Sequence, residues 1–234
     1  MKRSFLALSV VALAAAALPS AASAQLIEVG QTSTPLVAPA CPKGTTSCRI
    51  VLTRVTALET LSDGVANPTA IHHAGELVGM TVGLSGISSN ASTRKTDIKY
   101  LNTTYGGSPR GWLTVLRPYG PRAKYGWQVA ASSNVIYFQH YLGQVAQFAL
   151  SKPVPVVPGE RVALTVPTWA PVLDINQNAK RFAYRQSRSS NCASPPSSEQ
   201  AQRRIGGIAH YKCNYAGTRV EYSATEITTP AKSS

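Results

Sequence analysis

The sequence has 234 residues and carries 23 Lys and Arg against 10 Asp and Glu, a formal net charge of +13. A chain of this length can bury a sizeable core without disulfides, and it suits one large all-β domain or two small ones. The charge favours anionic partners such as wall polymers, acidic polysaccharides, phospholipid headgroups or nucleic acid. Because the basic residues are dispersed, with no run of five, the sequence holds no specific nucleic-acid motif, and a soluble basic surface is the simplest interpretation.

Residues 1–24 have the pattern of a secretory signal peptide. A basic start and a short apolar run lead to small residues before the expected cleavage between Ala24 and Gln25. The apolar run is shorter than the ~20 residues that a membrane-spanning helix needs, and no later segment reaches that length. Position 25 is not a lipidatable Cys. We therefore predict a secreted or extracellular protein that is either released or held at the cell surface by contacts alone. Its mature net charge is +11, because two positive charges leave with the leader.

The mature chain reads as an extended arm followed by a single β domain. Residues 25–47 lack periodicity and hold three prolines, which predicts the arm and a small disulfide loop at its end. In residues 77–84, bulky apolar side chains alternate with small or polar ones, as in a strand with one face on a core. Further strands are predicted at 48–59, 97–102, 112–117, 125–131, 134–142, 145–150, 161–166, 181–187 and 219–224. This spacing of strands and turns predicts an antiparallel β-sandwich or barrel over residues 48–227.

Two polar segments lie outside the predicted strands. Residues 186–207 are rich in Ser, Arg and Pro and read as a long surface loop, in which 197–204 is the one stretch that could form a helical turn or two. Residues 228–234 are expected to be a disordered tail.

Four cysteines, an even number in an exported chain, are expected to form disulfides. Three pairings are formally possible, and proximity favours Cys41–Cys48 and Cys192–Cys213, each closing a local loop. A zinc site is disfavoured because no Cys-x-x-Cys occurs. We expect no metal and no cofactor.

The residues that could carry catalysis do not form a recognisable pattern. No two acids share a strand at i, i+2, and most adjoin turns, which disfavours the paired carboxylates of a glycoside hydrolase without excluding partners from different strands. There is no Gly-x-Ser-x-Gly elbow, and His72-His73 on a strand would point to opposite faces. No catalytic residue is assigned.

Aromatic residues near arginines are the best candidates for binding a ligand. Tyr119 lies in the turn Pro-Tyr-Gly-Pro and is expected to be exposed, and Trp169 lies in a segment bounded by prolines. Arg117 and Arg122 flank Tyr119 and could donate to a sugar or an anion, whereas Trp127 alternates with core-type residues and is expected to be buried. The predicted ligand site is Tyr119, Trp169, Arg117 and Arg122.

Several segments resemble a family of secreted actinobacterial β-sandwich proteins of unknown function. The resemblance covers most of the mature chain, and it is carried by turns, core aromatics and cysteines, at 62–64, 67–68, 75–84, 111–118, 142–143, 157–160, 166–171, 184–192, 210–215 and 222–224. It implies a jelly-roll-like sandwich and transfers no catalytic residue. The leading prediction is a secreted, non-enzymatic module that binds carbohydrate or an anionic cell-envelope polymer. The alternatives are a structural or protein-interaction module of the cell surface and, third, a polysaccharide hydrolase.

Overall fold

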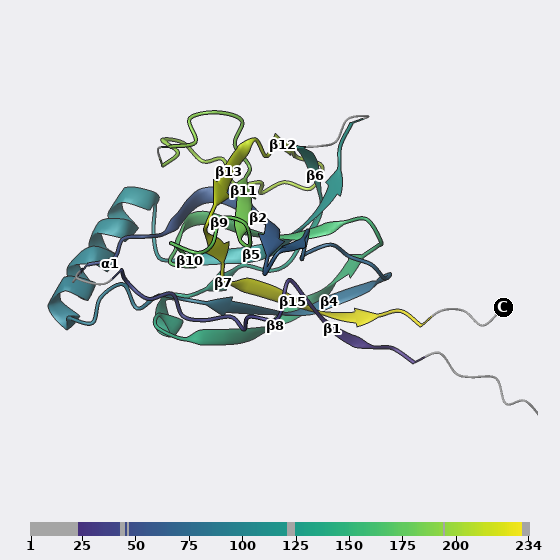
Figure 1. Ribbon diagram of the computed structural model, residues 1–234, viewed down its shortest axis with the longest axis horizontal. Coiled ribbons are helices and arrows are strands. Elements are labelled where there is room, and N and C mark those ends of the chain that lie inside the picture. Colours follow the sequence, from purple (N-terminus) through teal and green to yellow (C-terminus); the bar gives the residue numbers. More distant parts are fainter. Residues whose placement is uncertain (1–22, 43–44, 46, 121–124, 194, 231–234) are drawn as a thin grey trace, which may run out of the picture.

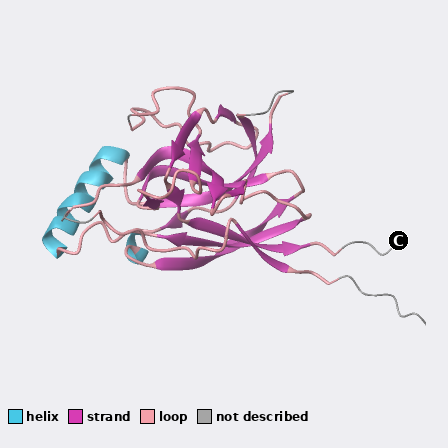
Figure 2. Ribbon diagram, viewed as in Figure 1, coloured by secondary structure: helices cyan, strands magenta, loops and turns pink. Residues whose placement is uncertain are grey.

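A computed structural model describes residues 23–230, except 43–44, 46, 121–124 and 194. Almost all of the predicted leader, Arg122, part of the predicted Cys41–Cys48 loop and the last four residues therefore lie outside the described part. Within it the fold is two layers of antiparallel sheet with one α-helix at one end (Figures 1 and 2). The prediction of an all-β sandwich is confirmed.

The smaller layer is a four-stranded sheet that contains both ends of the described chain. Its order is β1 (Leu26–Val29), β15 (Tyr222–Thr228), β4 (Gly75–Gly83) and β8 (Val145–Val156). Part of the predicted extended arm is therefore a sheet strand, because β1 pairs with β15, and Thr228, the first residue of the predicted tail, ends β15. The backbone N–H of Thr229 also donates to the carbonyl of Ala74 at 2.7 Å. The pairing of these segments satisfies backbone N–H and C=O groups for which the sequence pattern predicted no partner.

The larger sheet curls until its two edges meet. Its order is β12 (Ile208–His210), β6 (Gly126–Ser132), β5 (Arg110–Pro118), β9 (Arg161–Ala170), β2 (Leu52–Ser62), β11 (Ala183–Gln186) and β13 (Cys213–Ala216). The edge strands β12 and β13 are separated in the sequence only by Tyr211 and Lys212, so one short segment joins both edges. Short strands β3 (Val65–Ala66) and β7 (Ile136–Tyr137) pair with β2 and β5, and β10 (Leu173–Asp174) pairs with β14 (Arg219–Val220).

The curl places a hydrophobic core on each face of the larger sheet, apart from a smaller cluster under α1. Alternate residues of β5 point to opposite faces, so Leu113 and Val115 pack between the layers whereas Leu116 packs inside the curl. The inner core holds Leu116 with Leu58, Trp127, Val129, Ala163 and Tyr211. Trp127 is buried, as predicted. This second core forms the floor of the candidate site described below.

The α-helix α1 (Ala91–Tyr105) replaces the strand predicted at residues 97–102, which is wrong. The helix begins at Asn90, whose Oδ1 accepts the N–H of Thr93 at 3.0 Å, and ends at Gly106 in the left-handed conformation. Only Leu101 among its apolar side chains is fully buried, so the sequence carries a weak helical stripe. Residues 197–204, considered for a helical turn, are irregular, and the strand predicted at 134–142 is reduced to β7 and a 3₁₀ turn at Gln139–Tyr141.

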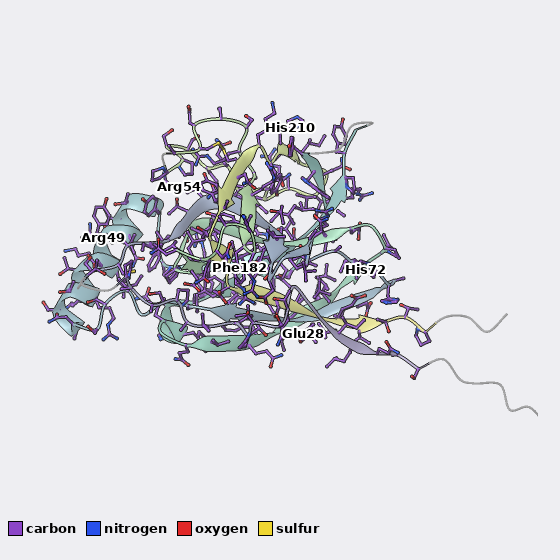
Figure 3. The ribbon with its side chains drawn as sticks, viewed as in Figure 1. Glu28, Arg49, Arg54, His72, Phe182 and His210 are labelled. Carbon is purple, nitrogen blue, oxygen red and sulfur yellow. A yellow bond between two sulfur atoms is a disulfide. The ribbon has the colours of Figure 1, made fainter. Side chains whose placement is uncertain are left out.

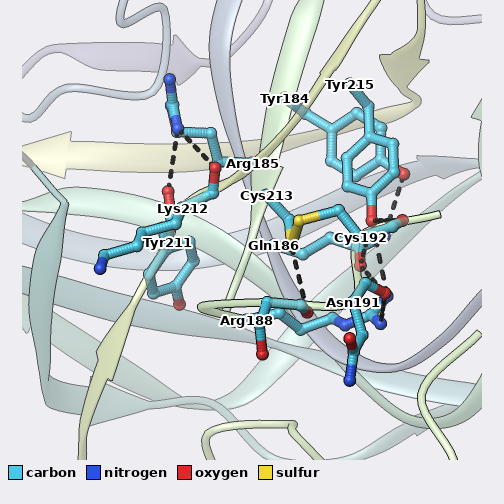
Figure 4. Close-up of a disulfide and its surroundings, with 11 residues drawn as sticks. Tyr184, Arg185, Gln186, Arg188, Asn191, Cys192, Tyr211, Lys212, Cys213 and Tyr215 are labelled. Atoms are coloured by element: carbon cyan, nitrogen blue, oxygen red, sulfur yellow. Dashed lines mark hydrogen bonds between the residues drawn. A yellow bond between two sulfur atoms is a disulfide. The ribbon is translucent and has the colours of Figure 1, made fainter. Parts of the chain in front are cut away.

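Of the two predicted disulfides, one is formed and the other is not. Cys192 and Cys213 form a disulfide that ties the long loop after β11 to β13 (Figure 4), which confirms this pairing. The predicted Cys41–Cys48 disulfide is not formed, and the two thiols are free but close enough to interact. The Cys41 thiol donates to the carbonyl of Ile87 at 3.3 Å, and burial raises its pKa to about 12.

Candidate functional site

The candidate site is a pocket of about 400 Å³ beside the hairpin that joins β5 to β6. Leu58 and Trp127 of the inner core form its floor, and both are buried. Polar and aromatic side chains from β2, β9, β11 and the turns surround this floor; they are Thr60, Asn67, Tyr125, Arg161 and Arg185, with Pro118 at the hairpin. We call this site the arginine pocket, because its two arginines supply the only formal charges among its described lining residues.

Arg161, the first residue of β9, is held by an aromatic ring and an amide. Its guanidinium carbon lies 4.7 Å from the ring centroid of Trp127, within the range of a cation–π contact. Its Nη1 donates to Oδ1 of Asn67, whose own backbone is kept in the left-handed conformation (φ 54°) and bonded to Thr60. Partial burial lowers the pKa of Arg161, but arginine stays protonated at neutral pH. A positive charge is therefore fixed in a half-buried position.

Arg185 on β11 is fixed at the place where the edges of the curled sheet meet. Its guanidinium carbon lies 4.4 Å from the ring centroid of Tyr125. Its Nη1 donates to the carbonyls of Tyr211 and Lys212, each at 3.1 Å, in the segment that joins β12 to β13 (Figure 4). The closure of the sheet thus orients this side chain through backbone contacts, which do not depend on flexible partners.

Neither arginine of the pocket has a carboxylate partner within the described residues. A guanidinium carries five N–H donors, and here only Nη1 of each group donates to another described residue. The remaining donors can bind an acceptor from outside the chain. Two pre-oriented cations over an apolar floor are suited to a carboxylate, phosphate or sulfate.

The ligand residues predicted from the sequence fall into two groups. Tyr119 is 47% exposed in the hairpin, as expected, and Arg117 is exposed on β5. Pro118 between them lines the arginine pocket, but neither Arg117 nor Tyr119 is among its lining residues. Arg117 occupies an odd position of β5, whose side chains point to the opposite face of the strand from Pro118. Arg122 lies outside the described residues.

The expectation that Trp169 is exposed is wrong. Its side chain is fully buried between β9 and α1, and its indole N–H donates to Oδ1 of Asn102 at 3.0 Å and to the carbonyl of Gly107 at 3.1 Å. Trp169 therefore fixes the end of the helix, and its ring offers no face to a ligand.

Sequence reasoning missed Arg161 and Arg185 because no local signal marks them. They are 24 residues apart and lie on different strands, and they reach Trp127 and Tyr125 only through the order of strands in the sheet. The cluster of aromatics that includes Tyr125 and Trp127 was the available clue.

A second group of charged residues is sealed inside the molecule and does not form a catalytic site. Glu59, Arg219 and Glu221 are buried, and Arg219 donates to the carbonyls of Thr34 and Pro35 at 3.0 Å each. Burial raises the pKa of Glu59 well above its usual value and that of Glu221 to about 7, against the opposing effect of Arg219. Residues 34–37 contact Arg219 and Glu221, since the N–H of Val37 also donates to Oε2 of Glu221 at 3.0 Å, and all three charged side chains are buried.

Over the described ranges, no group of three or more His, Cys, Asp or Glu side chains is arranged to hold a metal ion. In the same part of the chain, no helix is both long and apolar enough to cross a membrane. No protein-family model, curated protein sequence or solved structure matches the chain.

Proposed function

We propose that this chain is an exported, non-enzymatic module that binds an anionic carbohydrate polymer of the cell envelope through the arginine pocket. The observation that carries the proposal is the pair Arg161 and Arg185, two fixed cations in one half-buried pocket without a carboxylate partner among the described residues. The planar guanidinium matches the two oxygens of a carboxylate or phosphate, and partial burial strengthens such contacts.

The geometry favours an anionic over a neutral sugar. Trp127 is only 5% exposed, and Arg161 lies over its ring, so the indole face is not available for stacking on a sugar. An exposed ring, that of Tyr119, lies in the neighbouring hairpin outside the pocket lining. The expected net charge of +11 after removal of the leader would draw a polyanion toward the protein.

The other two functions considered have less support. A hydrolase needs carboxyls at its substrate, and none lines the arginine pocket among the residues described. A protein-interaction module does not require two oriented arginines in a pocket of this size. It becomes the better explanation if no polymer binds.

The test is binding of polygalacturonate, a carboxylated polysaccharide, with neutral dextran as the comparison ligand. Isothermal titration calorimetry is run on the mature chain, on Arg161→Gln, on Arg185→Gln and on the double variant. Lys152→Gln is the control, because it removes the same charge from an exposed position on β8 in the other layer. Thermal melts establish that each variant is folded.

We expect polygalacturonate and not dextran to bind, with affinity that falls as salt is added. Each arginine substitution should weaken binding by about ten- to a hundredfold, since a charge-assisted hydrogen bond contributes about 1.5–3 kcal/mol. Lys152→Gln should bind like the unaltered chain. Equal binding by the double variant and Lys152→Gln, or no binding at all, would overturn the proposal.

A further inference from the structure

A second pocket of arginines and aromatics lies at the opposite end of β5. It has a volume of about 420 Å³, and its lining residues come from β5, β6, β7 and the long loop; among them are Arg110, Trp112, Tyr137 and Arg203. Trp112 is almost buried, whereas Tyr137 is 56% exposed with the Arg110 guanidinium 6.0 Å from its ring centroid. We call this site the distal pocket. It repeats the composition of the arginine pocket, with one aromatic ring freely exposed.

Both pockets open on the same side of the larger sheet. Trp112 lines the distal pocket and Pro118 lines the arginine pocket, and both occupy even positions of β5, which face away from the core between the layers. At about 3.3 Å per residue, the strand separates them by roughly 20 Å.

The segment Arg203–Lys212 runs from one pocket to the other along β6. At its start Arg203 lines the distal pocket, and in its middle Gly206 donates to the carbonyl of Val129 at 2.8 Å. At its end the carbonyl of Lys212 holds Arg185 in the arginine pocket. Figure 1 shows β12, part of this segment, beside β6 at the upper edge of the molecule. We call the segment the basic edge.

The side chains of the basic edge continue the positive charge of the two pockets. Arg203, Arg204 and Lys212 are exposed and positively charged, and Figure 3 shows the neighbouring His210 on the outer surface. The sequence from 199 to 212 contains one acid, Glu199, which pairs with Arg203 at 3.1 Å. A polyanion lying along this edge therefore meets cations at both ends and between them.

We infer that the polymer bound by the arginine pocket continues along the basic edge and that the distal pocket binds a further stretch of the same chain, an inference that rests on the proposed function. The ligand class is a linear acidic polysaccharide with charges on successive sugars, long enough to reach both pockets. Binding at the first pocket raises the effective concentration of the polymer at the second, so two weak sites give tighter binding than either alone.

The test compares a long polygalacturonate with a galacturonate oligomer too short to span the two pockets. The double variant Arg110→Gln/Arg203→Gln is measured beside Arg161→Gln/Arg185→Gln. The control is Lys99→Gln/Lys152→Gln, which removes the same charge at exposed positions on α1 and β8. Thermal melts again verify folding.

If the inference is right, Arg110→Gln/Arg203→Gln binds the short oligomer normally but loses about tenfold in affinity for the long polymer. Arg161→Gln/Arg185→Gln loses affinity for both. If the distal variant binds the long polymer as tightly as the control, the distal pocket has no role, while the arginine pocket keeps its function. If the unaltered chain binds neither ligand, the proposed function itself fails.

Discussion

Replacing Glu221 by Gln should remove a large part of the pH dependence of stability. Burial raises the pKa of this carboxyl from 4.5 to about 7, with Arg219 3.5 Å away and the Val37 N–H bonded to its other oxygen. The folded state therefore holds a proton between these pH values that the unfolded state releases. Stability from this group is fully present below pH 4.5 and is lost as pH rises to about 7. The loss is about 3 kcal/mol, at 1.36 kcal/mol for each pH unit.

The assay is urea unfolding of the unaltered chain and Glu221→Gln at several pH values from 4.5 to 7. Gln does not titrate, so any effect of the substitution on stability that is independent of pH is the same at pH 4.5 and at pH 7. It cancels when the difference in stability between the two chains is compared at these two pH values. We expect the stability of Glu221→Gln relative to the unaltered chain to improve by about 3 kcal/mol from the acid to the neutral end. Glu76→Gln, which alters an exposed carboxyl on β4, is the control. If Glu221→Gln keeps the pH slope of the unaltered chain, the buried carboxyl is ionised throughout and the reasoning is refuted.

Three further substitutions test the packing. Gly83→Ala would place a Cβ 1.8 Å from the backbone carbonyl oxygen of Val37, so the free energy of unfolding should fall by about 3 kcal/mol or more. Gly86→Ala is the control for this substitution in the same urea assay. It should not show this loss, because the nearest atom to its Cβ is 3.6 Å away. Trp169→Phe leaves two acceptors without their indole donor and should cost about 2 kcal/mol; an unchanged urea midpoint would contradict the role given to this N–H. Replacing Cys192 and Cys213 by Ser opens a loop with a sequence separation of 21 and should lower the free energy of unfolding by about 3 kcal/mol. Reduction of the disulfide in the unaltered chain should give the same urea midpoint as this variant.

The strands could be predicted where one face is buried and the other is not, as in β8. The helix α1 was missed because its apolar residues are few, although Asn90 before it and Gly106 after it are ordinary capping residues. Trp169 was misplaced for a different reason. Pro167 suggested a loop, but it lies in β9 where the pairing with β2 shifts register, a position that tolerates a residue without an N–H.

The candidate site was only partly accessible to sequence reasoning. The hairpin beside the pocket, with Arg117 and Tyr119, is a local feature that its turn residues predict. Arg161 and Arg185 were not found, because their meeting depends on β9 and β11 both flanking β2, and strand order is a property of the whole chain. Pairing between strands that are far apart in the chain produces no regular residue spacing that a sequence pattern could reveal.

The pairing of distant segments also has a consequence for how the chain folds. The backbone N–H of Gln25 donates to Thr228, 203 residues away, and the inner core is closed only by β12 and β13. Neither layer can be completed before the last strands have been synthesised, and non-local contacts of this kind make folding slow. The arginine pocket needs β9, β11 and the segment that joins β12 to β13, so it forms only after these late strands have paired.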